Sequence, residues 1–186
     1  MNYMDIKILD IANGPGCRVS LFVSGCRRHC KECFNPETWD FSHGKPFTLD
    51  VENKVIEQLK HSWIDGLTIL GGEPFEPENQ VAVLNFIKKV REELPNTSIW
   101  MYTGFKVEEL WGQSIITREI LNNIDILVDG EFINELKDIR LQYCGSKNQR
   151  VINTHHLQFG KIFTYDQYDF SNGEVKKSGL IPFYKE

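Results

Sequence analysis

The sequence contains no long hydrophobic run. Its longest apolar stretches, such as those at 19–23 and 124–128, are far shorter than the ~20 residues that a membrane-spanning helix needs. The first residues, Met1 to Lys7, include acidic and polar side chains and lack the apolar segment of a secretory signal peptide. We therefore expect a cytoplasmic protein that makes no use of a membrane.

An excess of basic residues is also missing. The 21 Lys and Arg residues are outnumbered by 26 Asp and Glu residues, which gives a net charge of −5. Proteins that bind nucleic acids in general present a basic face, so we expect no nucleic-acid partner. Repeats and low-complexity tracts are lacking as well, while 12% of the residues are aromatic and predict a folded core. The 186 residues suit one domain, which we assign to 1–150, followed by a C-terminal extension of unknown role at 151–186.

The apolar periodicity alternates between strands and helices. Strands are expected at 6–11, 18–24, 66–70, 98–102 and 125–128, and helices at 50–62, 77–94, 107–111 and 115–122. In the second helix, Val81, Leu84, Ile87 and Val90 are expected to form the apolar face, and 155–165 reads as a strand or hairpin arm. This order predicts an α/β fold with a parallel sheet. The carboxyl ends of its strands should share one site.

Three of the five cysteines lie within eight residues. Cys26, Cys30 and Cys33 form a C-x3-C-x2-C pattern in a long loop. Thiolates are ligands for zinc or for iron–sulfur clusters, and three of them on a [4Fe–4S] cube leave one iron open. A structural zinc site, completed by His29, His43 or Cys144, is the alternative. It lacks the second ligand pair that zinc sites favour.

Glycine and polar residues follow the other strands of the predicted sheet. Gly71, Gly72 and Glu73 come directly after one strand, Thr103 after the next and Asp129 after the third. Glycines allow a close backbone approach to a ligand, and Thr103 or Asp129 could contact a ribose, a cation or a charged ligand. An ordinary strand-to-helix turn is the alternative at each position.

The cysteine spacing resembles that of the radical S-adenosylmethionine family. The resemblance implies a partial (β/α) TIM-like barrel and a [4Fe–4S] cluster held by the three cysteines. Its open iron would bind S-adenosylmethionine. It further implies that Gly71, Gly72 and Glu73 receive the methionyl ammonium, while Glu32, Cys33 and Phe34 lie near the adenine. The family often has an aromatic residue where Glu32 stands, so stacking from position 32 is lost.

Further segments resemble one branch of that family, the activating proteins of anaerobic ribonucleoside-triphosphate reductases. The segments are 10–16, 21–26, 33–35, 38–39, 44–48, 71–74, 102–105, 127–132 and 145–149. The resemblance implies a glycyl-radical activase that takes hydrogen from a glycine of the reductase, with reduced flavodoxin or a similar protein as electron donor. Cys144 stands where the branch usually has arginine and Cys17 where threonine is common; we interpret both as packing residues. A homodimer is left open.

Three alternatives remain at this stage. The chain could activate another glycyl-radical enzyme such as pyruvate formate-lyase, or it could be a small-molecule radical enzyme such as a deazapurine synthase. A zinc-stabilised interaction module is the non-enzymatic alternative. Beside the cysteines, Arg27, Arg28 and Lys31 form a basic patch, which is either a solvated loop or a docking site for an acidic electron donor.

Overall fold

The computed structural model describes residues 1–165 and 177–182. Its strands form one mixed sheet in the order β3-β1-β2-β4-β5-β6-β7-β8-β9. The strands are β1 (Asn2–Asp10), β2 (Arg18–Val23), β3 (Lys45–Pro46), β4 (Gly66–Gly71), β5 (Ser98–Tyr102), β6 (Ile126–Asp129), β7 (Arg150–Asn153), β8 (Lys161–Tyr165) and β9 (Lys177–Pro182). Strands β2, β4, β5 and β6 run parallel, and the flanking strands are antiparallel. The predicted α/β class is confirmed, whereas the barrel stays a prediction.

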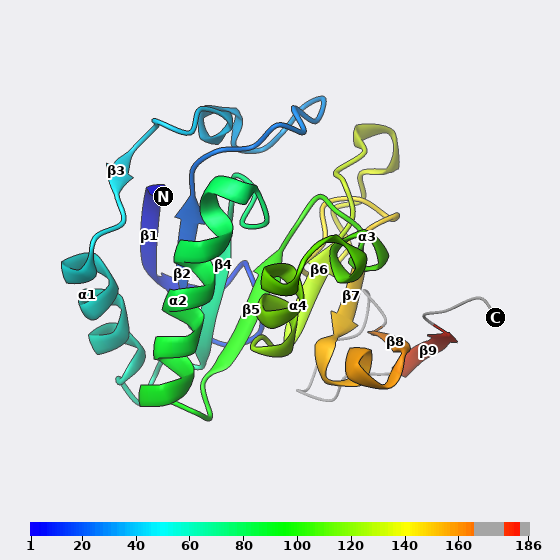
Figure 1. Ribbon diagram of the computed structural model, residues 1–186. Helices are drawn as coiled ribbons and strands as arrows, with labels where there is room; N and C mark the ends of the chain where they lie inside the picture. Colours follow the sequence, from blue (N-terminus) through cyan, green and yellow to red (C-terminus); the bar gives the residue numbers. More distant parts are fainter. Residues whose placement is uncertain (166–176, 183–186) are drawn as a thin grey trace.

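The helices cover one face of this sheet (Figure 1). They are α1 (Leu49–Leu59), α2 (Pro77–Glu93), α3 (Val107–Gln113) and α4 (Ile115–Asn122), and short 3-10 helices lie at η1 (Pro36–Trp39), η2 (Asn134–Leu136) and η3 (Thr154–Phe159). Proline in the first turn starts α2, where its missing N–H costs nothing. The Ser114 side chain accepts a bond from the Thr117 N–H and so caps α4. None of the described helices is long and apolar enough to cross a membrane.

The main core lies between the parallel strands and the helices. Val19, Leu21 and Ile69 of the sheet are fully buried against side chains such as Ile56 of α1 and Phe86 of α2. In α1 the apolar residues Val55, Ile56 and Leu59 are buried against the sheet, and Val51 is half-buried. 

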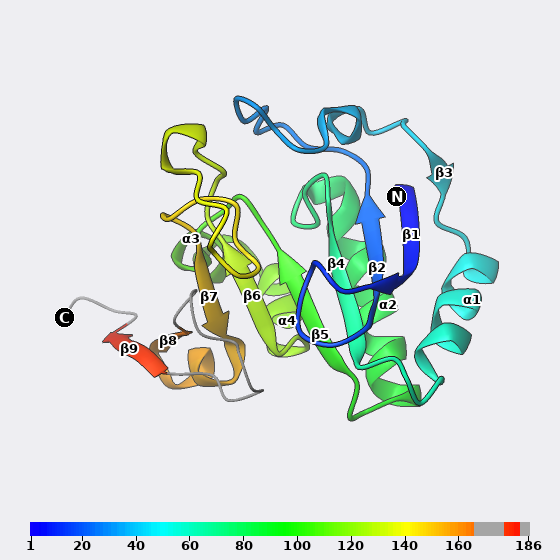
Figure 2. The same cartoon turned by 180° about the vertical axis from the view of Figure 1, so that it is seen from behind.

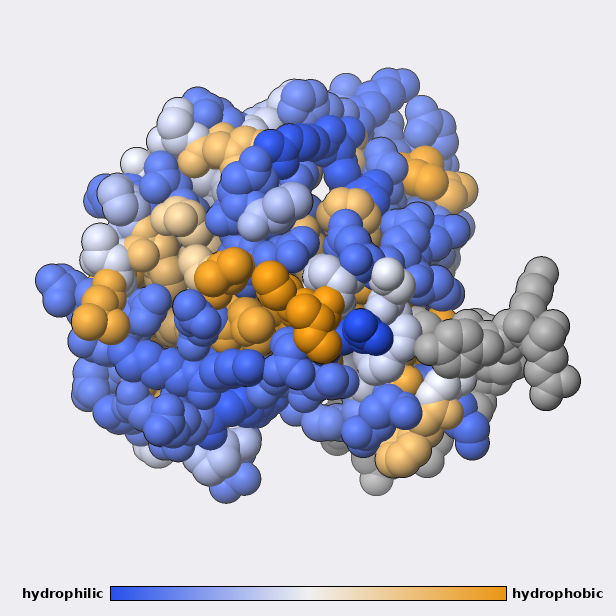
Figure 3. Space-filling view, in the orientation of Figure 1, coloured by the Kyte–Doolittle hydropathy of each residue, from blue (hydrophilic) through white to orange (hydrophobic). Residues whose placement is uncertain are grey.

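The predicted face of α2 is partly wrong. Val81 is 55% exposed, and the buried apolar residues are Val83, Phe86, Ile87 and Val90. A step of three residues at every position drifts around a helix of 3.6 residues per turn, whereas steps of three and four stay on one face. Figure 3 shows the apolar patch that remains exposed over α2 and α4.

The end of the sheet that follows β6 also differs from the prediction. Residues 154–159 form the helix η3 before β8 begins, so His155 and His156 lie on a helix and not on a strand. His155 Nε2 lies 3.1 Å from Asp125, and His156 packs on Phe163. The proposed boundary at 150/151 falls within β7, which pairs with β6 along its full length.

A buried arginine connects the amino-terminal ends of three strands. Arg18 of β2 is 1% exposed. Its Nε donates to Thr68 Oγ1 at 2.7 Å, and its Nη2 donates to the carbonyls of Leu67 at 2.8 Å and Ser98 at 2.9 Å. Burial lowers the pKa of Arg18 to about 10, because desolvation disfavours the charged form. The connection between β1 and β2 crosses the face of the sheet that lies away from the helices (Figure 2).

Candidate active site

The carboxyl ends of the parallel strands surround one cavity of about 360 Å³, a size in the range of small-molecule sites. Its lining includes all three clustered cysteines, Glu32 and Phe34, together with Gly71, Gly72, Glu73 and Thr103 from the ends of β4 and β5. Gly130, directly after β6, also contributes. The strand order thus brings together residues more than 100 positions apart, as the sequence predicts.

The cysteine loop is attached to the β4 end by backbone hydrogen bonds. The Gly25 N–H donates to the Thr38 carbonyl at 2.7 Å, and the Glu73 N–H donates to the Gly25 carbonyl at 2.8 Å. A Cβ on Gly72 would lie 2.6 Å from the Gly25 oxygen. Residue 72 must therefore be glycine. The side chain of a larger residue would displace the start of the cysteine loop before that side chain could reach a ligand in the cavity.

The three cysteines are free thiols on one wall of the cavity. Burial raises the pKa of Cys26 to about 11, with Glu73 and Cys30 adding to the effect. Burial also raises the pKa of Cys30, with Glu131 and Cys33 contributing. In the described part of the chain, no three His, Cys, Asp or Glu side chains are gathered around a single-ion position. A cube of four irons receives each thiolate at a separate corner, and three soft donors from one loop beside an open cavity fit that geometry.

Glu73 is the buried carboxylate of the site. Its Oε1 accepts from the Phe75 N–H at 3.0 Å and the Thr103 hydroxyl at 2.9 Å, and its Oε2 accepts from the Gly104 N–H at 2.8 Å. Burial nevertheless raises the pKa of Glu73 to about 7, against the opposing effect of these hydrogen bonds. Two carboxylate oxygens offer about four acceptor positions, so one position on Oε2 is left for a cation.

Asp129 occupies a different environment from Glu73. It is 1% exposed and does not line the cavity. Its Oδ2 accepts from the Val107 N–H at 2.8 Å and its Oδ1 from Arg150 Nε at 2.9 Å, and Arg150 also pairs with Glu108. Burial raises the pKa of Asp129 despite the arginine. These contacts hold α3 and β7 against β6, so its predicted cofactor contact stays a prediction.

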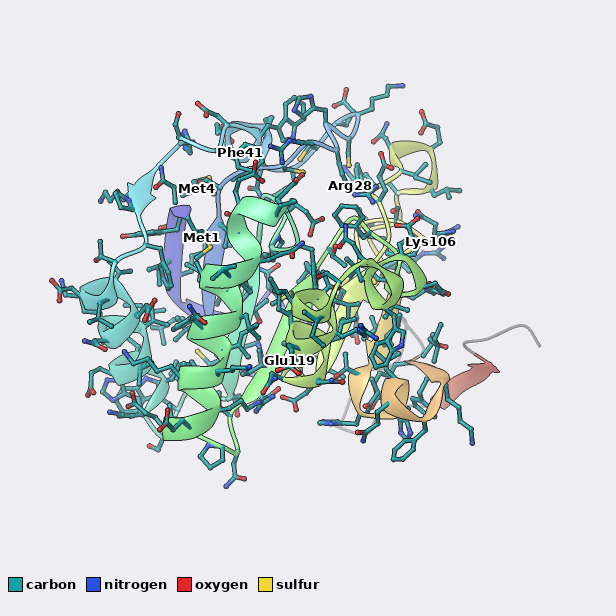
Figure 4. The ribbon with its side chains drawn as sticks, in the orientation of Figure 1. Met1, Met4, Arg28, Phe41, Lys106 and Glu119 are labelled. Carbon is teal, nitrogen blue, oxygen red and sulfur yellow. The ribbon has the colours of Figure 1, made fainter. Side chains whose placement is uncertain are left out.

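The basic residues of the cysteine loop are all engaged within the protein. Arg27 pairs with Glu76 and Glu78, Arg28 with Glu109 and Glu131, and Lys31 with Glu135. Figure 4 shows Arg28 between the cysteine loop and the segments that follow β5 and β6. The side chains of Arg27 and Lys31 are nevertheless 56% and 73% exposed, so the choice between a solvated loop and a docking site for an acidic donor stays a prediction.

Some lining residues received no role from the sequence. Tyr102, Trp39 and Arg28 each carry a buried side-chain donor with no hydrogen-bond partner: the hydroxyl, the indole Nε1 and the guanidinium Nε. Gln149 lines the cavity and bonds the Gly145 N–H and the Gly130 carbonyl. The resemblance segments 38–39, 102–105 and 145–149 contain Trp39, Tyr102 and Gln149 but gave them no role, because the approach of distant segments is not encoded in a local pattern.

The two remaining cysteines lie outside this cavity lining. Cys144 packs against the small cluster of Trp100, Val128 and Val151, and burial raises its pKa to about 12. Cys17 is half-buried, and its N–H donates to Asp65 at 2.7 Å.

Comparison with known proteins agrees with this site. A family model described as a 4Fe-4S single cluster domain matches residues 12–152. The anaerobic ribonucleoside-triphosphate reductase-activating protein of Escherichia coli K12 is 40% identical over 160 residues, which cover 85% of this chain and 100% of the relative. The chain belongs to the family of anaerobic ribonucleoside-triphosphate reductase-activating proteins.

Other relatives with that name support the same conclusion. The protein of Vibrio cholerae is 43% identical over 153 residues, covering 81% of this chain and 97% of the relative. That of Enterobacteria phage T4 is 38% identical over 151 residues, covering 81% and 93%. The predicted family, its 4Fe-4S cluster domain and the enzyme class, a radical activating enzyme of anaerobic ribonucleotide reductase, are confirmed.

Proposed function

We propose that this chain activates an anaerobic ribonucleoside-triphosphate reductase by reductive cleavage of S-adenosylmethionine beside a [4Fe–4S] cluster held by Cys26, Cys30 and Cys33. One observation carries the proposal: three free cysteines and the carboxyl ends of four strands share a single cavity, in a chain of this family. Held by these three cysteines, a reduced cluster would supply the one electron needed to cleave the sulfonium C–S bond to methionine and a 5′-deoxyadenosyl radical. The radical takes a hydrogen atom from a reductase glycine, giving 5′-deoxyadenosine and a glycyl radical.

In this proposal Glu73 receives the methionyl ammonium. Glu73 lines the cavity, is 1% exposed, and has only one hydrogen bond on its Oε2. A charge pair is stronger at a low dielectric than in water. Thr103 positions the carboxylate through its hydroxyl. Because Gly71 and Gly72 have no side chains, the end of β4 can lie directly against the backbone of β2 and of the cysteine loop.

The opposite side of the cofactor is assigned to the third cysteine and its neighbours. Glu32, Cys33 and Phe34 line the cavity, and we assign the adenine to these three residues. Phe34 is 93% exposed, so its ring is available to a ligand or to a partner that covers it. Asp129 itself does not line the cavity. In this proposal the cofactor contact predicted for Asp129 is made by its neighbour Gly130, which does line it.

The reductase is the partner that the family implies. We further propose reduced flavodoxin or a similar donor as the source of the electron, activity in the cytoplasm, and a partial barrel built around β2, β4, β5 and β6. The homodimer, and the division into a domain at 1–150 and an extension at 151–186, stay part of the proposal. The match to the family model ends at residue 152, so all but the first two residues of the extension lie outside that match.

The proposal is tested by anaerobic electron paramagnetic resonance. Reconstituted protein is incubated with S-adenosylmethionine, a chemical reductant and the anaerobic reductase of the same organism. We expect a glycyl-radical doublet together with equal amounts of methionine and 5′-deoxyadenosine. Pyruvate formate-lyase replaces the reductase in the control. A doublet on that enzyme alone would favour the alternative activase, and cleavage without any glycyl radical would favour a small-molecule enzyme.

A further inference from the structure

Arg28 places a cation at the wall of the cavity. It follows Cys26 by two residues in the cysteine loop, and 21% of its side chain is exposed. A Cβ built on Gly104 would lie 2.3 Å from the Arg28 Cδ, so the stem of the arginine packs against the segment that follows β5. Its guanidinium lies over the Phe105 ring, 4.2 Å from the centroid. The side chain therefore reaches from the cysteine loop to the end of β5 (Figure 4).

Few hydrogen bonds hold the guanidinium of Arg28. A guanidinium has five N–H donors, but in the described part of the chain only Nη1 has an acceptor within hydrogen-bond distance, Glu131 Oε2 at 3.3 Å. Nη2 lies 3.8 Å from Glu109 Oε2, and the buried Nε has no partner. The two carboxylates are 47% and 58% exposed, and ion pairs with exposed groups contribute little to stability. Most of the donors of Arg28 are therefore left for a ligand.

Arg28 and Glu73 lie on the same part of the cavity wall. The Gly104 N–H donates to Glu73 Oε2 at 2.8 Å, and the stem of Arg28 packs against that same glycine. Burial raises the pKa of Glu73 to about 7, and the positive charge of Arg28 opposes this rise. The two charges are therefore close enough to interact, and the wall carries an anion and a cation as neighbours.

We propose that Arg28 binds the α-carboxylate of S-adenosylmethionine while Glu73 binds its α-ammonium. The inference rests on the proposed function and assigns a residue to the second charge of the cofactor. In an amino acid both charged groups are attached to one carbon atom, so the protein groups that recognise them must be neighbours, as Arg28 and Glu73 are. A planar guanidinium can donate two parallel N–H bonds to a carboxylate. Arg28 is thus the residue that distinguishes the intact cofactor from analogues without the carboxylate.

The test compares S-adenosylmethionine with its decarboxylated analogue, which lacks the α-carboxylate. The Kd of each is measured by anaerobic calorimetry on the reconstituted full chain, and the iron content shows that the cluster is intact. Arg28→Gln should raise the Kd for S-adenosylmethionine at least tenfold, because it removes charge-assisted hydrogen bonds. Its Kd for the analogue should rise less than threefold, since the analogue offers no carboxylate to Arg28. Arg28→Lys keeps the charge but loses the paired donors, so its Kd for S-adenosylmethionine should be intermediate.

Two variants serve as controls. Lys31→Gln removes a positive charge from the same loop, but Lys31 is 73% exposed and does not line the cavity. Both Kd values should therefore stay within twofold of wild type. Glu131→Gln removes the charge that competes for the guanidinium of Arg28, so it should bind S-adenosylmethionine as tightly as wild type or more tightly.

The inference is overturned if Arg28→Gln weakens the binding of both ligands equally. It is also overturned if Glu131→Gln weakens the binding of S-adenosylmethionine as much as Arg28→Gln does, because Arg28 would then act only by fastening the cysteine loop. A wild-type holoprotein that does not bind S-adenosylmethionine at all would instead overturn the proposed function, so the two failures are distinguishable.

Discussion

The two ends of the parallel strands treat buried polar groups in opposite ways. At the amino-terminal end, Arg18 is a buried cation whose Nε and Nη2 both have acceptors within the protein, on Thr68, Leu67 and Ser98. At the carboxyl end, Tyr102, Trp39 and Arg28 keep donors without partners around a cavity.

Unpaired buried polar groups are costly and rare. In α/β folds the carboxyl ends of parallel strands carry function, whereas the other end contributes stability. The paired groups at the amino-terminal end therefore serve stability, whereas the unpaired donors at the carboxyl end serve ligand binding.

The largest expected effect comes from removing a cluster ligand. Cys26→Ala, Cys30→Ala and Cys33→Ala should each lower methionine formation more than ~100-fold, since even outer contacts of metal sites are worth 10–100-fold. Iron content and methionine yield after anaerobic reconstitution measure this. Cys144→Ala, a half-buried cysteine outside the cavity, should retain cleavage. Equal loss in Cys144→Ala would mean that the ligands are wrongly assigned.

The second-largest effect is expected on the stability of the protein, from a substitution at the amino-terminal end of the parallel strands. Arg18→Ala should lower the free energy of unfolding by about 2–4 kcal/mol, because the carbonyls of Leu67 and Ser98 lose their buried donor and each such loss costs about 1–3 kcal/mol. Urea unfolding followed by circular dichroism measures it. Arg118→Ala, an exposed arginine on α4, should change stability by less than about 0.5 kcal/mol. Similar values for both variants would contradict the role given to Arg18.

A smaller effect is expected from the protonation of Glu73. Burial raises its pKa to about 7, so the carboxylate is mainly neutral below that pH and mainly charged above it. If the charged form binds the cofactor's ammonium, affinity for S-adenosylmethionine should fall about tenfold per pH unit below 7, since one pKa unit corresponds to about 1.4 kcal/mol. Anaerobic calorimetry of the holoenzyme at pH 6, 7 and 8 tests this. Glu73→Gln should bind weakly at all three values, and the wild-type slope persisting in that variant would assign the titration to another group.

The smallest effect is expected from Tyr102→Phe. The Tyr102 ring is only half-buried, but its hydroxyl is fully buried and has no partner. Removal should therefore change the free energy of unfolding by less than about 0.5 kcal/mol, unlike the loss of a paired group. If a ligand accepts from this hydroxyl, affinity should fall about three- to tenfold. Unfolding and binding measured on the same samples separate the two contributions, and a large loss of stability would place the hydroxyl in a structural bond.

Most of the element order and the candidate site could be predicted from the sequence. Apolar periodicity located the parallel strands, and the strand ends then brought the cysteines, Glu73 and Thr103 to one cavity. The resemblance supplied the chemistry. The exposed position of Val81 was mispredicted, because an even three-residue spacing imitates an amphipathic face.

Contacts between distant segments could not be predicted. The engagement of Asp129 by Arg150 depends on β7 returning beside β6, and nothing local in either segment shows it. The same holds for the ion pairs that join Lys31 to Glu135 and Arg28 to Glu131. Local patterns encode periodicity and turn chemistry, while side-chain partners across the sheet follow from tertiary packing.

The reversal of direction at β7 has a further consequence. After four parallel strands, β7 runs antiparallel to β6, and the strand order ends at β3 on one side and β9 on the other. A sheet that is open at both edges leaves room for a folded macromolecule and equally for dioxygen. Under the proposed function, this architecture would expose the radical to oxygen until the docked reductase covered the cavity.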